Sequence, residues 1–187
     1  MVKKIRGCVF ISGKGTNLAS LIKSSRSNNF PVKIELVISN KKSAPGLYIA
    51  KKNSIPCKYF SSTHGKIFEK KCLDELKKRK IKFLCLAGFM KILSKNFIKI
   101  FGHKIVNIHP SLLPKYKGTN THARVLENKE KFSGCTTHFV TPKLDSGKII
   151  MQKKILLDKN ENEISLKKKI LKIEHTIYPQ SIIKIFK

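Results

Sequence analysis

The sequence has 187 residues, 41% of them hydrophobic, and its 40 basic residues against 11 acidic ones give a formal net charge of +29. This length predicts a single domain over residues 1–187 with a substantial hydrophobic core. No run approaches the roughly 20 apolar residues that span a bilayer, and the start of the chain lacks the long apolar stretch of a signal peptide. The sequence therefore predicts a cytoplasmic protein that makes no membrane contact.

The high positive charge is the one compositional feature that suggests a polyanionic partner. Only four of the 40 basic residues are arginine, however, and the lysines are dispersed along the whole chain. Proteins that read nucleic acids favour arginine, whose planar guanidinium makes bidentate contacts with bases and phosphates. We therefore interpret the charge chiefly as a residue bias and expect no specific nucleic acid partner; a nucleic-acid-binding surface is the alternative.

The cysteines and histidines argue against a disulfide framework and a metal site. The five cysteines are an odd number without a CxxC pair, and Cys8 and Cys85 lie in apolar runs where a thiol behaves as a core residue. The six histidines show neither HxH nor HxxxH spacing and have no acidic cluster beside them. We expect reduced cysteines and no metal.

Short apolar runs with the β-branched content of buried strands recur along the first 110 residues. They lie at residues 5–12, 32–39, 82–88 and 104–109. Two later segments, 136–140 and 148–157, are also predicted as strands, and an antiparallel orientation is open for them.

Helical periodicity separates these runs. Apolar residues fall on one helix face over residues 18–22 and 68–76, and over 166–177 they repeat at spacings of four, three and four. Alternation of strands and helices implies right-handed βαβ units. The predicted fold class is therefore α/β, with one open, Rossmann-like, mostly parallel sheet covered by helices on both faces.

Ligands of such sheets bind beyond the carboxyl ends of the strands. Three unusual segments fall on that edge: SGKGTN at 12–17, GFMKIL at 88–93 and NIHPSLLP at 107–114. We therefore expect the functional site to form where these segments meet.

The SGKGTN segment joins a predicted strand to a predicted helix. Its glycines allow a tight turn, and the helix start offers N–H groups to an anion. The third glycine of a dinucleotide fingerprint is replaced by Leu18, and the GK[ST] ending of a P-loop is absent. The segment predicts a site for a phosphate monoester; the alternative is a plain turn with Thr16 or Asn17 as a helix cap.

The GFMKIL segment combines a glycine with bulky apolar side chains. It could line a slot for a flat heterocycle, with backbone groups bonding the heterocycle's edge. The alternative is a strand end that leads into a core helix.

The NIHP stretch presents an amide and an imidazole together. Side chains alternate in a strand, so Asn107 and His109 point to one side, and Pro110 keeps His109 extended. Such a pair could stabilise an oxyanion and move a proton; the alternative is a structural histidine. Asp145 is predicted to orient His109, although an aspartate before Gly147 also suits an ordinary turn.

The motifs SGKGTN, LAGFMKIL, NIHPSLLPKYKG, THFV, LDSGKII and EHTIYP, which run in this order from Ile5 to Pro179, resemble the folate-dependent formyltransferases. The SGKGTN and EHTIYP motifs are most similar to the members that act in purine synthesis. The resemblance implies a formyltransferase fold and an enzyme that transfers a formyl group from the co-substrate 10-formyltetrahydrofolate to the amine of glycinamide ribonucleotide. The resemblance also implies that no metal and no covalent enzyme intermediate take part, and we expect a monomer or a homodimer.

The resemblance also assigns roles to residues. Gly15, Thr16, Asn17 and Glu174 would bind the substrate, the first three at its phosphate. The pterin pocket of the folate would be lined by Met90, Lys91, Ile92, Leu93 and Asn107. The catalytic residues would be Asn107, His109 and Asp145. We expect a protonated His109, because a nearby carboxylate raises the pKa of an imidazole.

Some positions depart from the family pattern. Residues 62–66 lack an arginine that helps to bind folate in relatives, and His64 or Lys66 could replace it. Asn120 stands where relatives carry a histidine, and GFMK replaces GFMR. Transfer-RNA formyltransferases and formyl-folate hydrolases share the NIHPSLLP core, but they usually carry an added domain that we do not expect in 187 residues.

Overall fold

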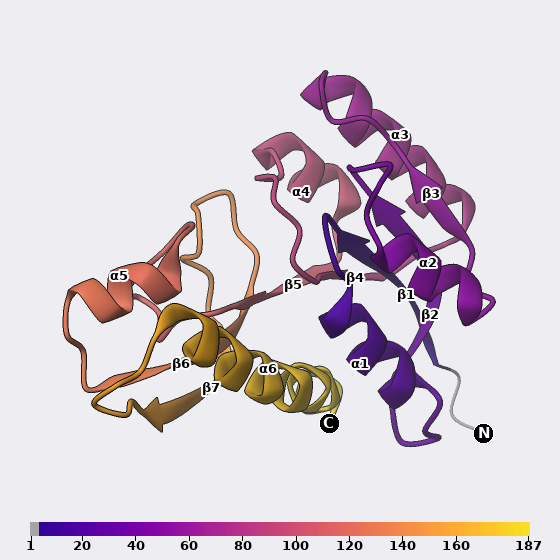
Figure 1. Cartoon of the computed structure of the whole chain (residues 1–187). Coiled ribbons are helices and arrows are strands. Elements are labelled where there is room, and N and C mark those ends of the chain that lie inside the picture. The colour runs from indigo at the N-terminus through magenta and orange to yellow at the C-terminus, as the bar shows by residue number, and fades with distance from the viewer. Residues whose placement is uncertain (1–3) are drawn as a thin grey trace.

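The computed structural model describes residues 4–187 and contains, within that range, seven strands in one sheet and six helices (Figure 1). The predicted domain of residues 1–187 thus includes three residues outside the described part. In chain order the elements are β1 (Ile5–Ile11), α1 (Thr16–Ser25), β2 (Val32–Ser39), α2 (Gly46–Lys52), β3 (Cys57–Tyr59), α3 (Gly65–Lys78), β4 (Phe83–Leu86), α4 (Lys95–Phe101), β5 (Lys104–His109), α5 (Thr121–Glu127), β6 (Phe132–Phe139), β7 (Ile149–Leu156) and α6 (Glu163–Ile185).

The sheet has the strand order β3-β2-β1-β4-β5-β6-β7. The five strands from β1 to β5 run parallel, and β6 and β7 are antiparallel to their neighbours. The predicted α/β class is confirmed, and the two late strands take the antiparallel orientation. The chain moves outward from β1 to β3 and then returns to β4, so the topological switch point lies between β1 and β4, where ligands bind in such sheets.

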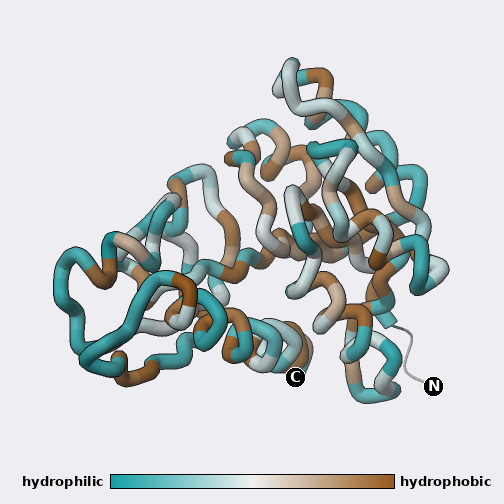
Figure 2. The backbone as a smooth tube through the Cα atoms, viewed as in Figure 1, coloured by the Kyte–Doolittle hydropathy of each residue, from teal (hydrophilic) through white to brown (hydrophobic). Residues whose placement is uncertain are grey.

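The strands are continuous apolar runs because both faces of the sheet are covered. On β1, Val9 and Ile11 pack into one hydrophobic cluster, whereas Cys8 and Phe10 pack into a second one. Helices α1 and α6 cover the first cluster, and α3 and α4 cover the second, on opposite sides of the sheet (Figure 1). Figure 2 shows hydrophobic segments gathered along the strands and hydrophilic ones at the periphery.

Four elements went unpredicted because they are short. Strand β3 has three residues, and α2, α4 and α5 have seven each, fewer than a periodic pattern needs to stand out. Strand β6 also begins at Phe132, ahead of the predicted segment 136–140. None of the helices within residues 4–187 is long and apolar enough to cross a membrane.

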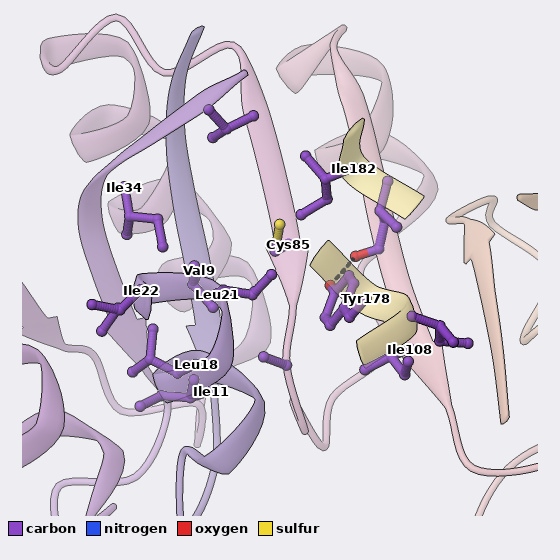
Figure 3. Packing of buried hydrophobic residues seen from close by; sticks show 14 of the residues in the cluster. Val9, Ile11, Leu18, Leu21, Ile22, Ile34, Cys85, Ile108, Tyr178 and Ile182 are labelled. Carbon is purple, nitrogen blue, oxygen red and sulfur yellow. Dashed lines mark hydrogen bonds between the residues drawn. The ribbon is translucent and has the colours of Figure 1, made fainter. Parts of the chain in front are cut away.

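The long helix α6 is tied to the sheet by Tyr178 and to α1 by Ser20. The Tyr178 hydroxyl lies 2.9 Å from the carbonyl oxygens of both Leu86 and Val106, and Figure 3 shows its ring between β4 and β5. Pro179 lies inside α6 and has no N–H for the carbonyl of His175, four residues earlier. The Ser20 hydroxyl donates to that carbonyl at 2.6 Å. Because Pro179 leaves the His175 carbonyl unpaired within α6, this carbonyl is free to accept the hydrogen bond that joins α6 to α1.

Candidate active site

The segments that follow β1 and β4 are joined at the switch point by Ser12. Its backbone N–H donates to the Gly88 carbonyl at 3.1 Å, and its hydroxyl accepts from the Met90 N–H at 2.8 Å. The same hydroxyl donates to Oδ1 of Asn40 at 2.6 Å, and the Asn40 amide lies 3.4 Å from the Ser62 hydroxyl. The expected meeting of the SGKGTN and GFMKIL segments is therefore present, and Asn40 brings residues after β2 to the same edge.

The polar end of β5 faces the segment after β6. Asp145 Oδ2 lies 3.4 Å from Nδ1 of His109, and both side chains are buried. His138 on β6 pairs directly with Asn107 in the antiparallel register, and its Nε2 lies 3.6 Å from Asp145 Oδ1. The structure thus brings Asn107, His109 and Asp145 together and adds His138 to them.

Hydrogen bonds fix which ring nitrogens carry protons. His109 Nε2 donates to the backbone carbonyl of Tyr116 at 2.8 Å, because a carbonyl can only accept. His138 Nδ1 likewise donates to the carbonyl of its neighbour Phe139 at 2.9 Å, and its Nε2 lies 3.2 Å from the Asn107 amide nitrogen. In neutral His109 the free lone pair is therefore on Nδ1, the nitrogen that faces Asp145.

The sequence predicted a protonated His109, but the burial of this site favours the neutral form. Burial lowers the pKa of His109 and outweighs the Tyr116 carbonyl and the Asp145 carboxylate, both of which raise it. The balance of these effects therefore favours the neutral imidazole. The expectation was wrong in its net direction because it counted the carboxylate and not the loss of water.

Asp145 is held as a carboxylate by the segment around it. Burial raises its pKa, but His138, the Gly118 N–H and His109 together lower it below its usual value. The Gly118 N–H donates to Oδ2 at 2.9 Å. Asp145 adopts a φ of 43°, and a Cβ on Gly147 would lie 1.7 Å from the Phe139 carbonyl oxygen. The LDSG turn therefore needs its glycine in order to place the aspartate.

The SGKGTN turn leads into α1 without a side-chain cap. Gly15 is the N-cap residue, with a φ of 76°, so neither Thr16 nor Asn17 caps the helix as the alternative interpretation required. A Cβ on Gly15 would lie 2.6 Å from Cα of Gly46 at the start of α2, and the Gly46 N–H donates to the Gly13 carbonyl at 3.0 Å. The turn is thus held by close backbone contact between two segments.

Glu174 reaches this turn from α6. Its Oε2 accepts from the Asn17 amide at 2.7 Å, although 157 residues separate the two in sequence. Burial raises the pKa of Glu174 to about 7, against a smaller lowering by Asn17. Asn17 Oδ1 is buried without a hydrogen-bond partner among residues 4–187. This pair therefore keeps polar capacity that a bound ligand can use.

A narrow hollow of about 80 Å³ lies between the GFMKIL segment and the side chains of Asn107, His138 and Asp145. Its lining, taken over the described residues, includes Lys91, Ile92, Leu93, Asn107, His138 and Asp145 but not Met90, His64 or Lys66. The Met90 side chain is exposed, and its contribution to this edge is the backbone bond to Ser12. A larger hollow of about 1030 Å³ lies between α3 and α4 and is lined by Lys66, but Asn107, His109 and Asp145 do not line it.

Sequence reasoning missed His138, Asn40 and the backbone groups of Tyr116 and Gly118. The alternation in TTHFV at 136–140 was a usable signal for His138, since it sets that side chain on one face of a strand with Thr136. Backbone groups leave no such signal. No group of three metal-binding side chains occurs within the part of the chain that the structure describes.

Comparisons with known proteins agree with the fold and the motif order. A trifunctional purine biosynthetic protein adenosine-3 from Homo sapiens is 38% identical over 183 residues, which are 96% of this chain but only 18% of that protein. The phosphoribosylglycinamide formyltransferase of Haemophilus influenzae is 39% identical over 181 residues, 95% of this chain and 84% of the relative.

A solved structure is similar over nearly its whole length. The crystal structure of a phosphoribosylglycinamide formyltransferase from Brucella melitensis has a TM-score of 0.93 at 36% identity, covering 98% of this chain and 96% of that one. The sequence profile of the formyl transferase family matches residues 5–182. The resemblance drawn from the motifs is thereby confirmed, and the chain belongs to the formyl transferase family.

Proposed function

We propose that this chain transfers the formyl group of 10-formyltetrahydrofolate to the amine of glycinamide ribonucleotide in purine biosynthesis. The likeness to phosphoribosylglycinamide formyltransferases over most of the chain supports this activity. The observation that carries the proposal is the buried cluster of Asn107, His109, His138 and Asp145 at the ligand edge of the sheet. It lies beside the hollow of the GFMKIL segment, at the same edge as the SGKGTN turn.

The substrate phosphate binds at the turn of Gly15, Thr16 and Asn17. N–H groups at the start of α1 favour an anion, and the αL glycine lets the backbone approach it. Glu174 accepts hydrogen bonds from polar groups on the substrate. The unpartnered Oδ1 of Asn17 only accepts hydrogen bonds, so it serves a hydroxyl or amine donor of the substrate, and Asn17 meets the phosphate through its backbone N–H.

The folate pterin enters the hollow lined by Lys91, Ile92, Leu93 and Asn107. Its volume of about 80 Å³ is well below the roughly 300 Å³ at the lower end for ligand pockets. The exposed side chain of Leu144, which also lines the hollow, therefore turns aside when folate binds, while Asp145 keeps its contacts. Met90 acts through its backbone bond to Ser12.

The reaction begins when the substrate amine attacks the formyl carbon, forming a C–N bond and placing negative charge on the formyl oxygen. His138 occupies one N–H of the Asn107 amide and so orients it, and the second N–H donates to this oxyanion. Neutral His109 takes the proton lost by the attacking amine on Nδ1, where Asp145 stabilises the imidazolium.

The tetrahedral intermediate then collapses. The bond between the formyl carbon and the folate nitrogen breaks, the proton on His109 passes to that leaving nitrogen, and the imidazole is neutral again. No metal enters any of these steps. Because the groups are buried and already in contact, the protein does not need to order them at each turnover.

A coupled assay with both substrates tests the proposal. Purified protein should consume 10-formyltetrahydrofolate only when glycinamide ribonucleotide is present, and it should ignore initiator methionyl-tRNA. Formylation of the tRNA alone, or release of formate without any acceptor, would assign the chain to one of the other two activities of the family.

A further inference from the structure

The backbone between β5 and α5 holds both members of the catalytic acid–base pair. The Tyr116 carbonyl accepts the Nε2–H of His109 at 2.8 Å, and two residues later the Gly118 N–H donates to Asp145 at 2.9 Å. Residues 115–119, which we call the clamp loop, therefore set the position of the imidazole and the carboxylate together. A displacement of this loop would misplace both groups at once.

The clamp loop does not have a conformation that its sequence favours by itself. Tyr116 has a φ of 56° and Gly118 a φ of 81°, so both lie in the left-handed region. A tyrosine rarely adopts that region unless surrounding contacts hold it there. The contacts that hold this loop are therefore part of the catalytic apparatus, although they lie outside the substrate pockets.

Arg124 on α5 supplies several of these contacts. Its Nη1 donates to the Lys117 carbonyl at 2.8 Å and lies 3.5 Å from the Thr119 carbonyl, on either side of Gly118. Its guanidinium also lies over the Tyr116 ring, 5.3 Å from the centroid. One planar cation thus contacts three of the five clamp-loop residues.

Glu130 secures the start of the same loop. Its Oε1 accepts from the Tyr116 hydroxyl at 2.8 Å and from Nζ of Lys115 at 2.7 Å. Arg124 forms no hydrogen bond with His109 or Asp145 among the described residues, so its contacts reach the pair through the loop backbone, while its positive charge also lowers the pKa of His109. We propose that Arg124, assisted by Glu130, is a positioning residue for formyl transfer that fixes His109 and Asp145 through the clamp loop. The inference rests on the proposed function for its kinetic test.

The test compares Arg124→Ala and Arg124→Lys with Arg26→Ala. Arg26 is a suitable control because its exposed guanidinium also makes a hydrogen bond, to Asn53, in a part of the chain remote from the site. We expect Arg124→Ala to lower kcat by about tenfold to a hundredfold, as for displacements of about 1 Å in catalytic groups. The KM of each substrate should change by less than about threefold, because neither pocket contains Arg124.

Lysine keeps the charge of Arg124 but cannot lie flat over the Tyr116 ring and reach both carbonyls. Arg124→Lys should therefore recover only part of kcat. Millimolar guanidinium should partly restore the Arg124→Ala variant and leave the wild type and Arg26→Ala unchanged. The proposal would be overturned if the loss of kcat in Arg124→Ala were explained by a smaller folded fraction and guanidinium restored none of it. Arg124 would then only stabilise the fold.

An NMR measurement separates this inference from the proposed function. In ¹⁵N-histidine spectra of the substrate-free protein, His109 should show a protonated, hydrogen-bonded Nε2. This signal should shift or broaden in Arg124→Ala and also in Arg124→Lys, which keeps the charge but not the contacts, and it should not change in Arg26→Ala. If the wild type lacks formyl transfer yet the His109 signal responds, the clamp stands and the proposed function fails. An unchanged His109 signal, together with a kcat within about threefold of the wild type, would overturn the clamp.

Discussion

The cluster around His109 and the SGKGTN turn lie on one edge of the sheet, but their buried polar groups differ in how far they are paired. In the cluster of Asn107, His109, His138 and Asp145, each group contacts another, and the pKa of Asp145 is lowered. At the turn, Glu174 has a pKa raised to about 7, and Asn17 Oδ1 has no partner within residues 4–187. The proposed catalytic groups are thus already in contact with one another, whereas the turn keeps an acceptor that the proposed substrate can use.

The largest expected effect on turnover comes from changing His109 or Asp145 in this cluster. His109→Ala removes the proton acceptor, and Asp145→Asn removes the charge that stabilises the imidazolium, so each should lower turnover by about 10² to 10⁴-fold. The double variant should lose far less than the product of both effects, because the two residues act as one unit. Turnover of all three variants at saturating substrate measures this.

His103→Ala is the matched control for these variants, since His103 is exposed and lies away from the cluster. It should retain wild-type turnover. If Asp145→Asn also retains it between about pH 6 and 8, Asp145 is only a turn residue and the mechanism has no carboxylate.

A second variant displaces the substrate turn and leaves the catalytic cluster intact. A Cβ on Gly46 would lie 2.6 Å from Cδ1 of Ile11, 3.1 Å from Cα of Gly15 and 3.2 Å from the Gly13 oxygen. The double variant Gly46→Ala with Ile11→Val lacks Cδ1 of residue 11, so the new methyl group contacts only the backbone atoms of Gly15 and Gly13. We expect KM for glycinamide ribonucleotide to rise about tenfold, equivalent to roughly 1.4 kcal/mol of binding free energy, with kcat little changed.

Gly65→Ala adds the same methyl group at the start of α3, where nothing lies within 4 Å. Its KM for glycinamide ribonucleotide should match the wild type. A double variant with kcat reduced and KM unchanged would show that the turn does not serve the substrate.

A smaller effect is a gain in stability that accompanies a loss of substrate binding. Because the pKa of Glu174 is about 7 in the folded protein and 4.5 ordinarily, its ionisation destabilises the fold as pH rises from 4.5 to 7. Glu174→Gln removes this cost and keeps an acceptor for Asn17. At about pH 8 the variant should gain up to roughly 3 kcal/mol in free energy of unfolding while binding substrate more weakly.

Urea unfolding at several pH values checks this prediction. The stability difference between Glu174→Gln and the wild type should be full above about pH 7 and should vanish below about pH 4.5. A difference that stays constant with pH would mean that the gain comes from packing and not from the ionisation of Glu174.

The smallest expected effect concerns the support of both regions by α6. Ser20→Ala leaves the His175 carbonyl without its donor, because Pro179 cannot supply one, and should cost about 1 kcal/mol of stability. Ser24→Ala on the same helix, which forms no side-chain hydrogen bond among the described residues, should cost less. Equal losses in thermal melts would show that the hydrogen bond from Ser20 to the His175 carbonyl adds nothing to the stability of the contact between α1 and α6.

Sequence patterns predicted the features that are set by residues close together along the chain. The central strands were predictable because burial on both faces makes them apolar throughout, and alternation placed Asn107 and His109 on one side of β5. The position of His138 opposite Asn107 was not predictable, since it depends on the register between β5 and β6. The protonation of His109 depends on how much water the fold excludes, which no local motif records.

The same limit applies to the clamp loop. Tyr116 and Gly118 act through a carbonyl and an N–H that every such residue carries, so their identities do not reveal a role. Arg124 was one of four arginines in a chain dominated by lysine, and that scarcity was a signal worth following. Only the structure connects it to the backbone that holds the catalytic pair.

The central claim is that a neutral, preassembled His109 begins the reaction. Its most direct test is a ¹⁵N NMR titration of His109 in the substrate-free protein. The burial of the ring and the Tyr116 carbonyl predict a neutral imidazole protonated on Nε2, with a pKa below its ordinary 6.5. A pKa above 6.5, or a neutral ring protonated on Nδ1, would contradict it.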